Sequence, residues 1–138
     1  MCAEVGWWRW KGFLMESRNL RELPPLRFTL FPVSLKGRAV DLREAPLKRD
    51  AKVWKSRDSY VGTQALARTA RSAGVGVILY ESVRDPLHGT NAAVLVPKAF
   101  GALAMTKAQT WTLLTSQDGA KWIRDGKEAL AFSARQWV

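Results

Sequence analysis

A hydroxyl and a guanidinium at the end of an apolar run are the first residues of this chain that suggest chemistry. The run Gly74–Tyr80 opens with glycines and is rich in bulky and β-branched residues, which predicts a buried strand. Ser82 and Arg84 follow it, and the pair Asp85-Pro86 then ends the strand. In an extended segment, side chains two residues apart share a face, so Ser82 and Arg84 are expected to point the same way. A hydroxyl beside a guanidinium fork suits phosphate oxygens, and the alternative interpretation is a pair of solvated loop residues.

The flanking segments must position these side chains. Asp58–Ala73 has apolar residues at helical spacing and is predicted to be a helix, with Gly74 as its left-handed C-terminal cap. Leu87–Thr90 is expected to be a loop, and Asn91–Val96 a second buried strand that Pro97 stops. This order of helix, strand, turn and strand gathers four polar residues around one strand-end crevice, a common location for ligands: Ser82, Arg84, His88 and Asn91.

Two members of this group also have interpretations that involve no ligand. His88, the single histidine, lies in a turn beside Gly89, where a histidine is usually solvated, although it could also contact phosphate. Asn91 opens the second strand and either bonds into the crevice or satisfies backbone groups there.

A carboxylate near the start of the chain is a further candidate. Glu4 lies one helical turn before Trp7 and Trp8, so an indole ring can shield it from water and tune its charge. Its alternative role is that of a carboxylate in the first turn of a helix, which the helix dipole favours.

At these residues the chain resembles a known family. Tyr60–Phe100, including the motif Tyr-Glu-Ser-Val-Arg-Asp-Pro at residues 80–86, resembles the second half of a RES domain. Residues 2–10 resemble the family's glutamate helix, and residues 28–31 and 37–42 its next two strands. The resemblance implies an α+β fold in which helices flank a mixed sheet, similar to ADP-ribosyltransferases. It therefore covers nearly the whole chain as a single domain, residues 1–138.

The resemblance also implies an activity and a partner. Members of the family are bacterial toxins that degrade NAD⁺ by phosphorolysis or hydrolysis of the nicotinamide–ribose bond. The family serine corresponds to Ser82 and the family glutamate to Glu4, which would be the catalytic residues. Ser82, Arg84, Asn91 and His88 would bind substrate or phosphate. NAD⁺ is then a substrate rather than a cofactor, with inorganic phosphate as a co-substrate. A small helical antitoxin protein is the implied partner.

One departure from the family pattern concerns the first residues. The family arginine lies on an early strand, before the glutamate, whereas this chain begins three residues before Glu4. The early tyrosine of the NAD⁺ pocket has no counterpart either. We expect from this a RES domain without its first strands, with impaired activity. We also expect a homo-oligomer, because unpaired strand edges and the Trp7, Trp8 and Trp10 cluster would favour self-association.

Composition sets limits on compartment and metal content. The 138 residues suffice for one domain with a real core, and no apolar run is long enough to cross a membrane, so we expect no membrane contact. A single cysteine excludes an internal disulfide and is typical of a reducing cytoplasm. One cysteine and one histidine cannot make a Cys/His zinc site, so we expect no metal.

The net charge of +10 leaves a second function open. Five basic residues crowd the segment before the predicted helix: Lys48, Arg49, Lys52, Lys55 and Arg57. A solvated charged face is the simplest interpretation. The alternative function is a basic module that binds nucleic acid or protein without catalysis, although the seven tryptophans have spacings suited to a core. Residues 109–115 and 128–132 are predicted to form a structural hairpin around Asp118-Gly119.

Overall fold

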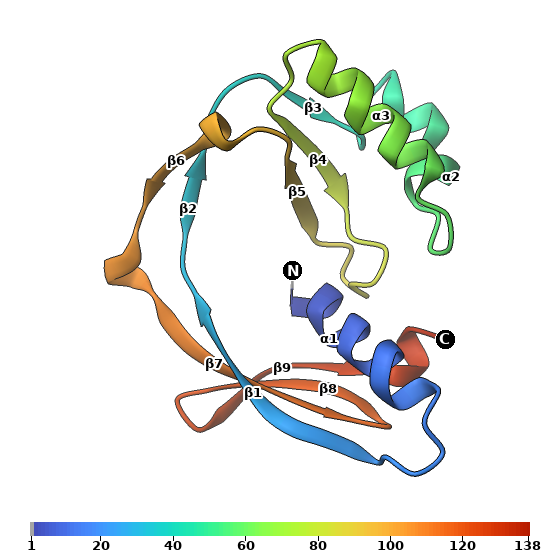
Figure 1. The fold of residues 1–138 in the computed structure, drawn as a ribbon, viewed down its shortest axis with the longest axis vertical. Helices are drawn as coiled ribbons and strands as arrows, with labels where there is room; N and C mark the ends of the chain where they lie inside the picture. The colour runs from blue at the N-terminus through green and yellow to red at the C-terminus, as the bar shows by residue number, and fades with distance from the viewer. Residues whose placement is uncertain (1) are drawn as a thin grey trace. The chain divides into compact units, whose positions relative to one another are not determined.

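The computed structural model describes residues 2–138, which form two compact units. The terminal unit contains the residues up to Pro32 together with Ala104–Val138, and the central unit is Val33–Leu103. Both combine helices or helical turns with sheets, so the predicted α+β class is confirmed (Figure 1). That the two units make up one domain stays a prediction.

The terminal unit is built on a four-stranded antiparallel sheet. Its strands are β1 (Glu22–Leu30), β7 (Gln109–Ser116), β8 (Gly119–Arg124) and β9 (Lys127–Ser133), in the order β1-β7-β8-β9. The helix α1 (Cys2–Trp10) continues into one π-helical turn, Lys11–Met15, and packs against β7 and β8. Short 3₁₀ turns at Met105–Lys107 and Ala134–Gln136 complete the unit.

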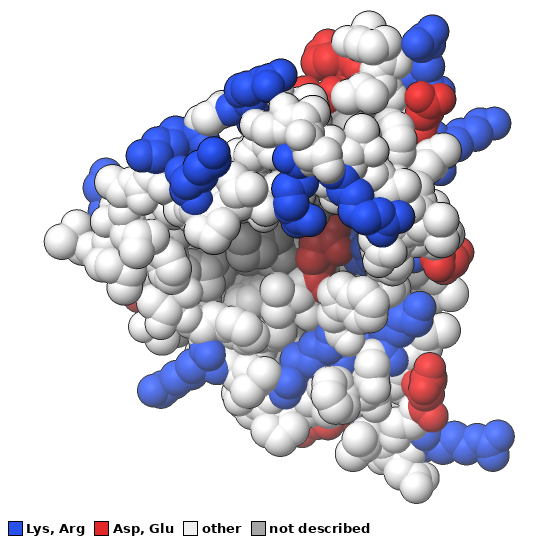
Figure 2. Space-filling model, turned by 45° about the horizontal axis from the view of Figure 1, so that its top comes forward, with Lys and Arg blue, Asp and Glu red and all other residues white. Residues whose placement is uncertain are grey.

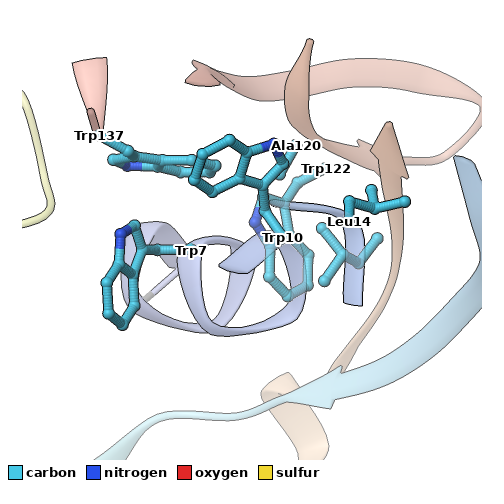
Figure 3. Packing of buried hydrophobic residues seen from close by; sticks show 7 residues of the cluster. Trp7, Trp10, Leu14, Ala120, Trp122 and Trp137 are labelled. Atoms are coloured by element: carbon cyan, nitrogen blue, oxygen red, sulfur yellow. The ribbon is translucent and has the colours of Figure 1, made fainter. Parts of the chain in front are cut away.

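Indole rings fill the core between α1 and this sheet. Trp7, Trp10 and Leu14 follow one another at helical spacing and pack with a cluster from the sheet and the C-terminal turn (Figure 3): Leu113, Ala120, Trp122 and Trp137. Two of the buried indole nitrogens have backbone acceptors, because Trp10 Nε1 donates to the Gln117 carbonyl and Trp122 Nε1 to the Cys2 carbonyl. The tryptophan-rich core that the spacing predicts is therefore present, and these rings are not available for base stacking.

The predicted late hairpin is wrong in one respect. Residues 109–115 and 128–132 do lie in strands, but β8 stands between them, so the segment is a three-stranded meander. Gln117 and Asp118 turn the chain from β7 into β8, which begins at Gly119. A second turn, at Asp125 and Gly126 with φ of 53° and 74°, connects β8 to β9. Two consecutive positive φ angles are typical of a type I′ hairpin turn, and Asp-Gly is one of its preferred pairs.

The central unit contains a three-stranded mixed sheet. β3 (Ala39–Asp41) runs parallel to β4 (Val77–Glu81), and β5 (Thr90–Val94) pairs with β4 antiparallel. The helices α2 (Ala51–Trp54) and α3 (Val61–Ser72) cover it, and the core lies between them and the strands: Leu42, Ala70, Val75 and Ile78. The remaining elements are the strand pair β2 (Val33–Leu35) with β6 (Phe100–Leu103) and 3₁₀ turns at Leu47–Asp50 and Pro97–Ala99.

The predicted helix and strands of the central unit are confirmed with shifted ends. The helix expected from Asp58 begins at Val61, because Tyr60 at φ −104° and ψ 2° has not yet entered helical geometry. Gly74 has a φ of 74°, the left-handed conformation expected of a C-terminal cap. The second strand begins at Thr90 and ends at Val94, two residues earlier than expected, and Pro97 starts a 3₁₀ turn.

Candidate functional site

A tight loop connects the end of β4 to the start of β5 and holds the predicted serine. Ser82 is 1% exposed, and its Oγ accepts hydrogen bonds from the backbone N–H of Arg84 (3.4 Å) and of Asp85 (3.1 Å). The Ser82 N–H donates to the Gly89 carbonyl at 2.9 Å, which closes the loop at its base. The Asp85 carboxylate accepts from the Leu87 N–H at 3.0 Å. The hydroxyl is thus oriented by the backbone that surrounds it.

The expected strand geometry of this segment is wrong beyond Glu81. The strand ends there, and Ser82–Asp85 bends instead of alternating, so Ser82 and Arg84 do not share a face through strand periodicity. They are connected by the turn instead, since the Ser82 hydroxyl accepts from the Arg84 N–H. Both residues are buried, which excludes the solvated-loop alternative.

The Arg84 side chain is hydrogen-bonded to the segment that precedes α3. Its Nη2 donates to the Tyr60 hydroxyl at 2.8 Å and lies 3.4 Å from the Arg57 carbonyl. Arg84 itself is 7% exposed. Burial of a guanidinium is costly unless its N–H groups are bonded, so these partners fix the charge in one place. Sequence reasoning did not identify Tyr60 as a member of this site, and no local pattern connects two residues that are 24 positions apart.

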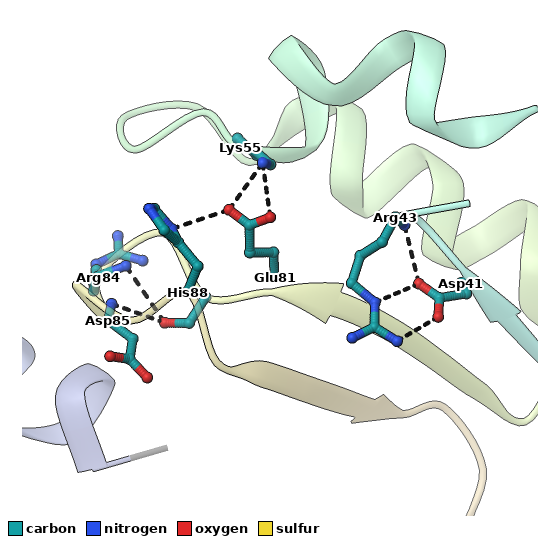
Figure 4. Close-up of polar contacts among 8 residues, drawn as sticks. Asp41, Arg43, Lys55, Glu81, Arg84, Asp85 and His88 are labelled. Atoms are coloured by element: carbon teal, nitrogen blue, oxygen red, sulfur yellow. Dashed lines mark hydrogen bonds and ion pairs between the residues drawn. The ribbon is translucent and has the colours of Figure 1, made fainter. Parts of the chain in front are cut away.

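His88 is exposed but not free to rotate in solvent. Its side chain is 67% exposed, and its Nδ1 lies 3.0 Å from Glu81 Oε1 (Figure 4). Lys55 Nζ donates to both Glu81 oxygens at 2.8 Å. The bonds from Lys55 lower the pKa of Glu81 below its usual range, with smaller contributions from the charges of His88 and Arg43. Glu81 is therefore an anion that holds two basic side chains at the mouth of the loop.

A second ion pair lies at the neighbouring strand end. Arg43 Nε and Nη2 donate to the two Asp41 oxygens at 2.8 and 2.5 Å, and the Arg43 N–H also donates to Asp41 (Figure 4). These bonds lower the pKa of Asp41 to about 2 and raise that of Arg43. Arg43 Nη1 also donates to the Thr90 hydroxyl, so the fork connects β3 with β5.

A small pocket opens beside these ion pairs. It has a volume of about 140 Å³, and six of its lining residues are basic, acidic or aromatic: Arg43, Lys48, Trp54, Lys55, Tyr80 and Glu81. Pockets for drug-sized ligands usually exceed roughly 300 Å³, so this one admits a group no larger than an inorganic anion or part of a larger ligand.

Asn91 is the fourth polar residue predicted near the strand end. It lies on β5 directly opposite Tyr80 of β4 and is half-buried. The structure thus brings Ser82, Arg84, His88 and Asn91 to one end of the same sheet, as the sequence predicts.

Glu4 belongs to the terminal unit, whereas Ser82 belongs to the central unit. It lies in the first turn of α1 and is half-buried, one turn before Trp7 and Trp8, whose rings meet edge to face at 4.6 Å. Lys11 Nζ lies 4.8 Å from the centre of the Trp7 ring. The helix and its tryptophan neighbours are as predicted, and a catalytic role for Glu4 stays a prediction.

The basic cluster before α3 forms a 3₁₀ turn followed by the short helix α2. Lys48 and Lys55 line the small pocket, and Lys55 is paired with Glu81. Lys and Arg side chains elsewhere are scattered over the visible face with Asp and Glu among them (Figure 2). This is the dispersed pattern of an ordinary charged surface rather than of one continuous basic stripe.

Two negative findings apply to residues 2–138. No helix in this part of the chain is both long and apolar enough to pass through a bilayer. Within the same residues, no group of three or more His, Cys, Asp or Glu side chains is placed to hold a metal ion.

Comparison with known families gives one match. The model of the RES domain matches residues 2–116, which include α1, the whole central unit and β7. No curated protein matches the chain significantly.

Proposed function

Because the chain belongs to the RES domain family, we propose that it degrades NAD⁺ by cleaving the bond between nicotinamide and ribose. The observation that supports this proposal most directly is the buried Ser82–Arg84 turn within the matched region. A buried, backbone-oriented hydroxyl beside a fixed guanidinium is an arrangement suited to a substrate that contains ribose and phosphate.

The proposed reaction is a displacement at the anomeric carbon of the nicotinamide ribose. The C–N bond breaks, its electron pair neutralises the pyridinium ring, and an oxygen of water or phosphate forms the new bond to carbon. Positive charge develops on the sugar in the transition state, and a carboxylate nearby stabilises it, as in glycoside hydrolysis. We assign that carboxylate to Glu4.

Ser82 and Arg84 have separate roles in this proposal. The Ser82 hydroxyl, oriented by the N–H groups of Arg84 and Asp85, donates to a ribose or phosphate oxygen. Arg84 supplies positive charge for the pyrophosphate, and its bond to Tyr60 keeps the guanidinium from rotating. His88 and Asn91 contact phosphate and ribose from the neighbouring loop and strand.

The family also suggests a biological setting. We propose that the chain is the toxin of a bacterial toxin–antitoxin pair, that it acts in the cytoplasm, and that a helical antitoxin blocks access to NAD⁺. A second copy of the chain is the other proposed partner, since Trp8, Phe13 and Met15 expose apolar side chains on α1 and the turn after it.

The test is release of nicotinamide from NAD⁺ by the full chain, with and without inorganic phosphate. We expect release that Glu4→Ala and Ser82→Ala abolish. Ser72→Ala is the matched control, because this serine lies exposed in the last turn of α3. ADP-ribose as product identifies water as the acceptor, and a phosphorylated ADP-ribose identifies phosphate. Release that survives Ser82→Ala unchanged would refute the assigned site.

A further inference from the structure

The end of the central sheet that lies away from Ser82 is strongly basic. β3 and β4 are parallel and in register from Ala39 and Val77, so the residues that precede the two strands lie at the same end. β4 has five residues, about 16 Å of extended chain, and therefore separates this end from the Ser82 loop.

Acidic residues are confined to two segments of the central unit, whereas basic residues occur throughout it. Its six acidic residues all occur at positions 41–58 and 81–85, that is, at and after the ends of β3 and β4. The segments 33–40, 61–80 and 86–103 contain no acidic residue. They do contain five Lys and Arg residues: Lys36, Arg38, Arg68, Arg71 and Lys98. Where such cations lie close together in space they repel one another, and a bound anion offsets that repulsion.

Three of these cations surround one pocket, which we call the basic pocket. It has a volume of about 250 Å³ and is lined by Lys36, Arg38 and Lys98 together with three glycines at positions 37, 74 and 76. None of the described residues that line it is acidic. Within residues 2–138, neither Lys36 nor Lys98 forms an ion pair.

The arginine of the basic pocket is held in place by the backbone. Arg38 Nη1 donates to the Ala73 carbonyl at 2.9 Å, which satisfies an acceptor at the end of α3. A Cβ on Gly74 would lie 3.8 Å from that same nitrogen, whereas glycine leaves the guanidinium accessible from this side. Gly37 has a φ of 110°, and a Cβ there would meet nothing within 4 Å, so the space beside this glycine is open. Helix capping explains the bond of Arg38 but not the two lysines beside it.

We propose that the basic pocket binds a small phosphate-type oxyanion with two or more negative charges, of the size of pyrophosphate. A multivalent anion matches three cations that have no acidic partner, and the guanidinium fork provides paired donors for its oxygens. The volume of about 250 Å³ accommodates a diphosphate group. The ligand is therefore free pyrophosphate or the diphosphate of a nucleotide. This inference concerns the central unit alone and does not depend on the proposed NAD⁺ cleavage.

Titration calorimetry on the full chain at low salt tests the inference, with inorganic pyrophosphate as the probe. We expect saturable binding that the triple variant Lys36→Gln/Arg38→Gln/Lys98→Gln weakens by about tenfold or more. The matched control is Lys48→Gln/Arg49→Gln/Lys52→Gln, which removes the same charge from the other end of the unit and should change affinity by less than about twofold. Absence of binding, or equal loss in both triple variants, would overturn the proposal.

Two further variants keep the test decisive if the triple variant folds poorly. Arg38→Lys retains the charge but not the fork, so binding should weaken while the fold is preserved. Arg68→Gln removes an exposed charge of α3 that does not line the basic pocket, so this variant should bind pyrophosphate as the unmodified chain does, and an equal loss there would mean that binding follows net charge alone. ADP then identifies the source: tighter binding than pyrophosphate indicates a nucleotide, and equal or weaker binding indicates the free anion.

Discussion

Replacing Tyr60 with phenylalanine removes the hydroxyl that accepts from Arg84 and leaves the ring in place. Arg84 is 7% exposed, so water cannot fully replace the lost acceptor. A hydrogen bond to a charged group contributes about 1.5–3 kcal/mol when both partners are buried. Tyr60 is 41% exposed, and the Arg57 carbonyl still lies 3.4 Å from the same nitrogen. Both facts reduce the loss, and we expect Tyr60→Phe to lower the free energy of unfolding by about 1 kcal/mol.

A double-mutant cycle with Arg84→Met isolates this contact. Urea unfolding of the unmodified chain, the two single variants and the double variant gives a coupling energy, which we expect to be about 1 kcal/mol. If Arg84 also binds the substrate phosphates, Tyr60→Phe should raise KM for NAD⁺ more than it lowers kcat, because the charge remains and only its position is less fixed. A coupling energy near zero would show that the 2.8 Å contact does not hold Arg84, and the reasoning on its burial would fail.

Two further predictions concern the free energy of unfolding, one on its dependence on pH and one on glycine substitutions. The pKa of Asp41 is lowered from 3.8 to about 2 by Arg43, so the stabilisation it provides is present above pH 3.8 and is lost as the pH falls toward 2. The pKa of Glu81 is lowered from 4.5, so its contribution is present above pH 4.5 and is also lost on acidification. Asp41→Asn should flatten this acid slope in urea unfolding measured from pH 2 to 6, and an unchanged slope would contradict the assignment. Gly119→Ala should destabilise the terminal unit by more than about 2 kcal/mol, since its Cβ would lie 2.0 Å from the Phe132 carbonyl oxygen at a φ of 139°. Gly126→Ala, at a φ of 74° with nothing within 4 Å, should cost only about 1 kcal/mol, and equal losses in thermal unfolding would refute the steric argument.

Local patterns in the sequence were sufficient for most elements of the fold. The small-residue helix, its glycine cap and the apolar strand after it were all predicted, because each depends on residues close together in the chain. β8 was missed although it alternates Ala120 and Trp122 with Lys121, and although Asp125-Gly126 marks the turn that follows. The predicted hairpin omits β8 because Asp118-Gly119 alone is taken as its turn.

β1 shows a different limit of sequence reasoning. The strand is nine residues long and passes through Pro24-Pro25, which normally argue against a strand. The structure accommodates them with a register shift between Leu23 and Leu26 on an edge strand, where missing N–H donors can face away from the ladder. The partner of β1 is β7, which lies far away in the sequence, so no local pattern could predict this tolerance.

The contacts of the candidate site show which of its side chains stabilise the fold. The Asp41–Arg43 pair is partly exposed, connects β3 to β5 through Thr90, and is explained as structure alone. Ser82 also has a structural task, because its hydroxyl accepts the N–H groups of the turn. Arg84 connects the loop to the segment before α3, but a turn capped by Ser82 does not by itself need a buried guanidinium, and burying one costs several kcal/mol before its bonds are counted. Tyr60 and the Arg57 carbonyl offset that cost with contacts that an apolar residue at position 84 would not require. A local rule broken at such cost is expected where a side chain is kept for chemistry rather than for stability, and this supports the proposal that Arg84 binds substrate.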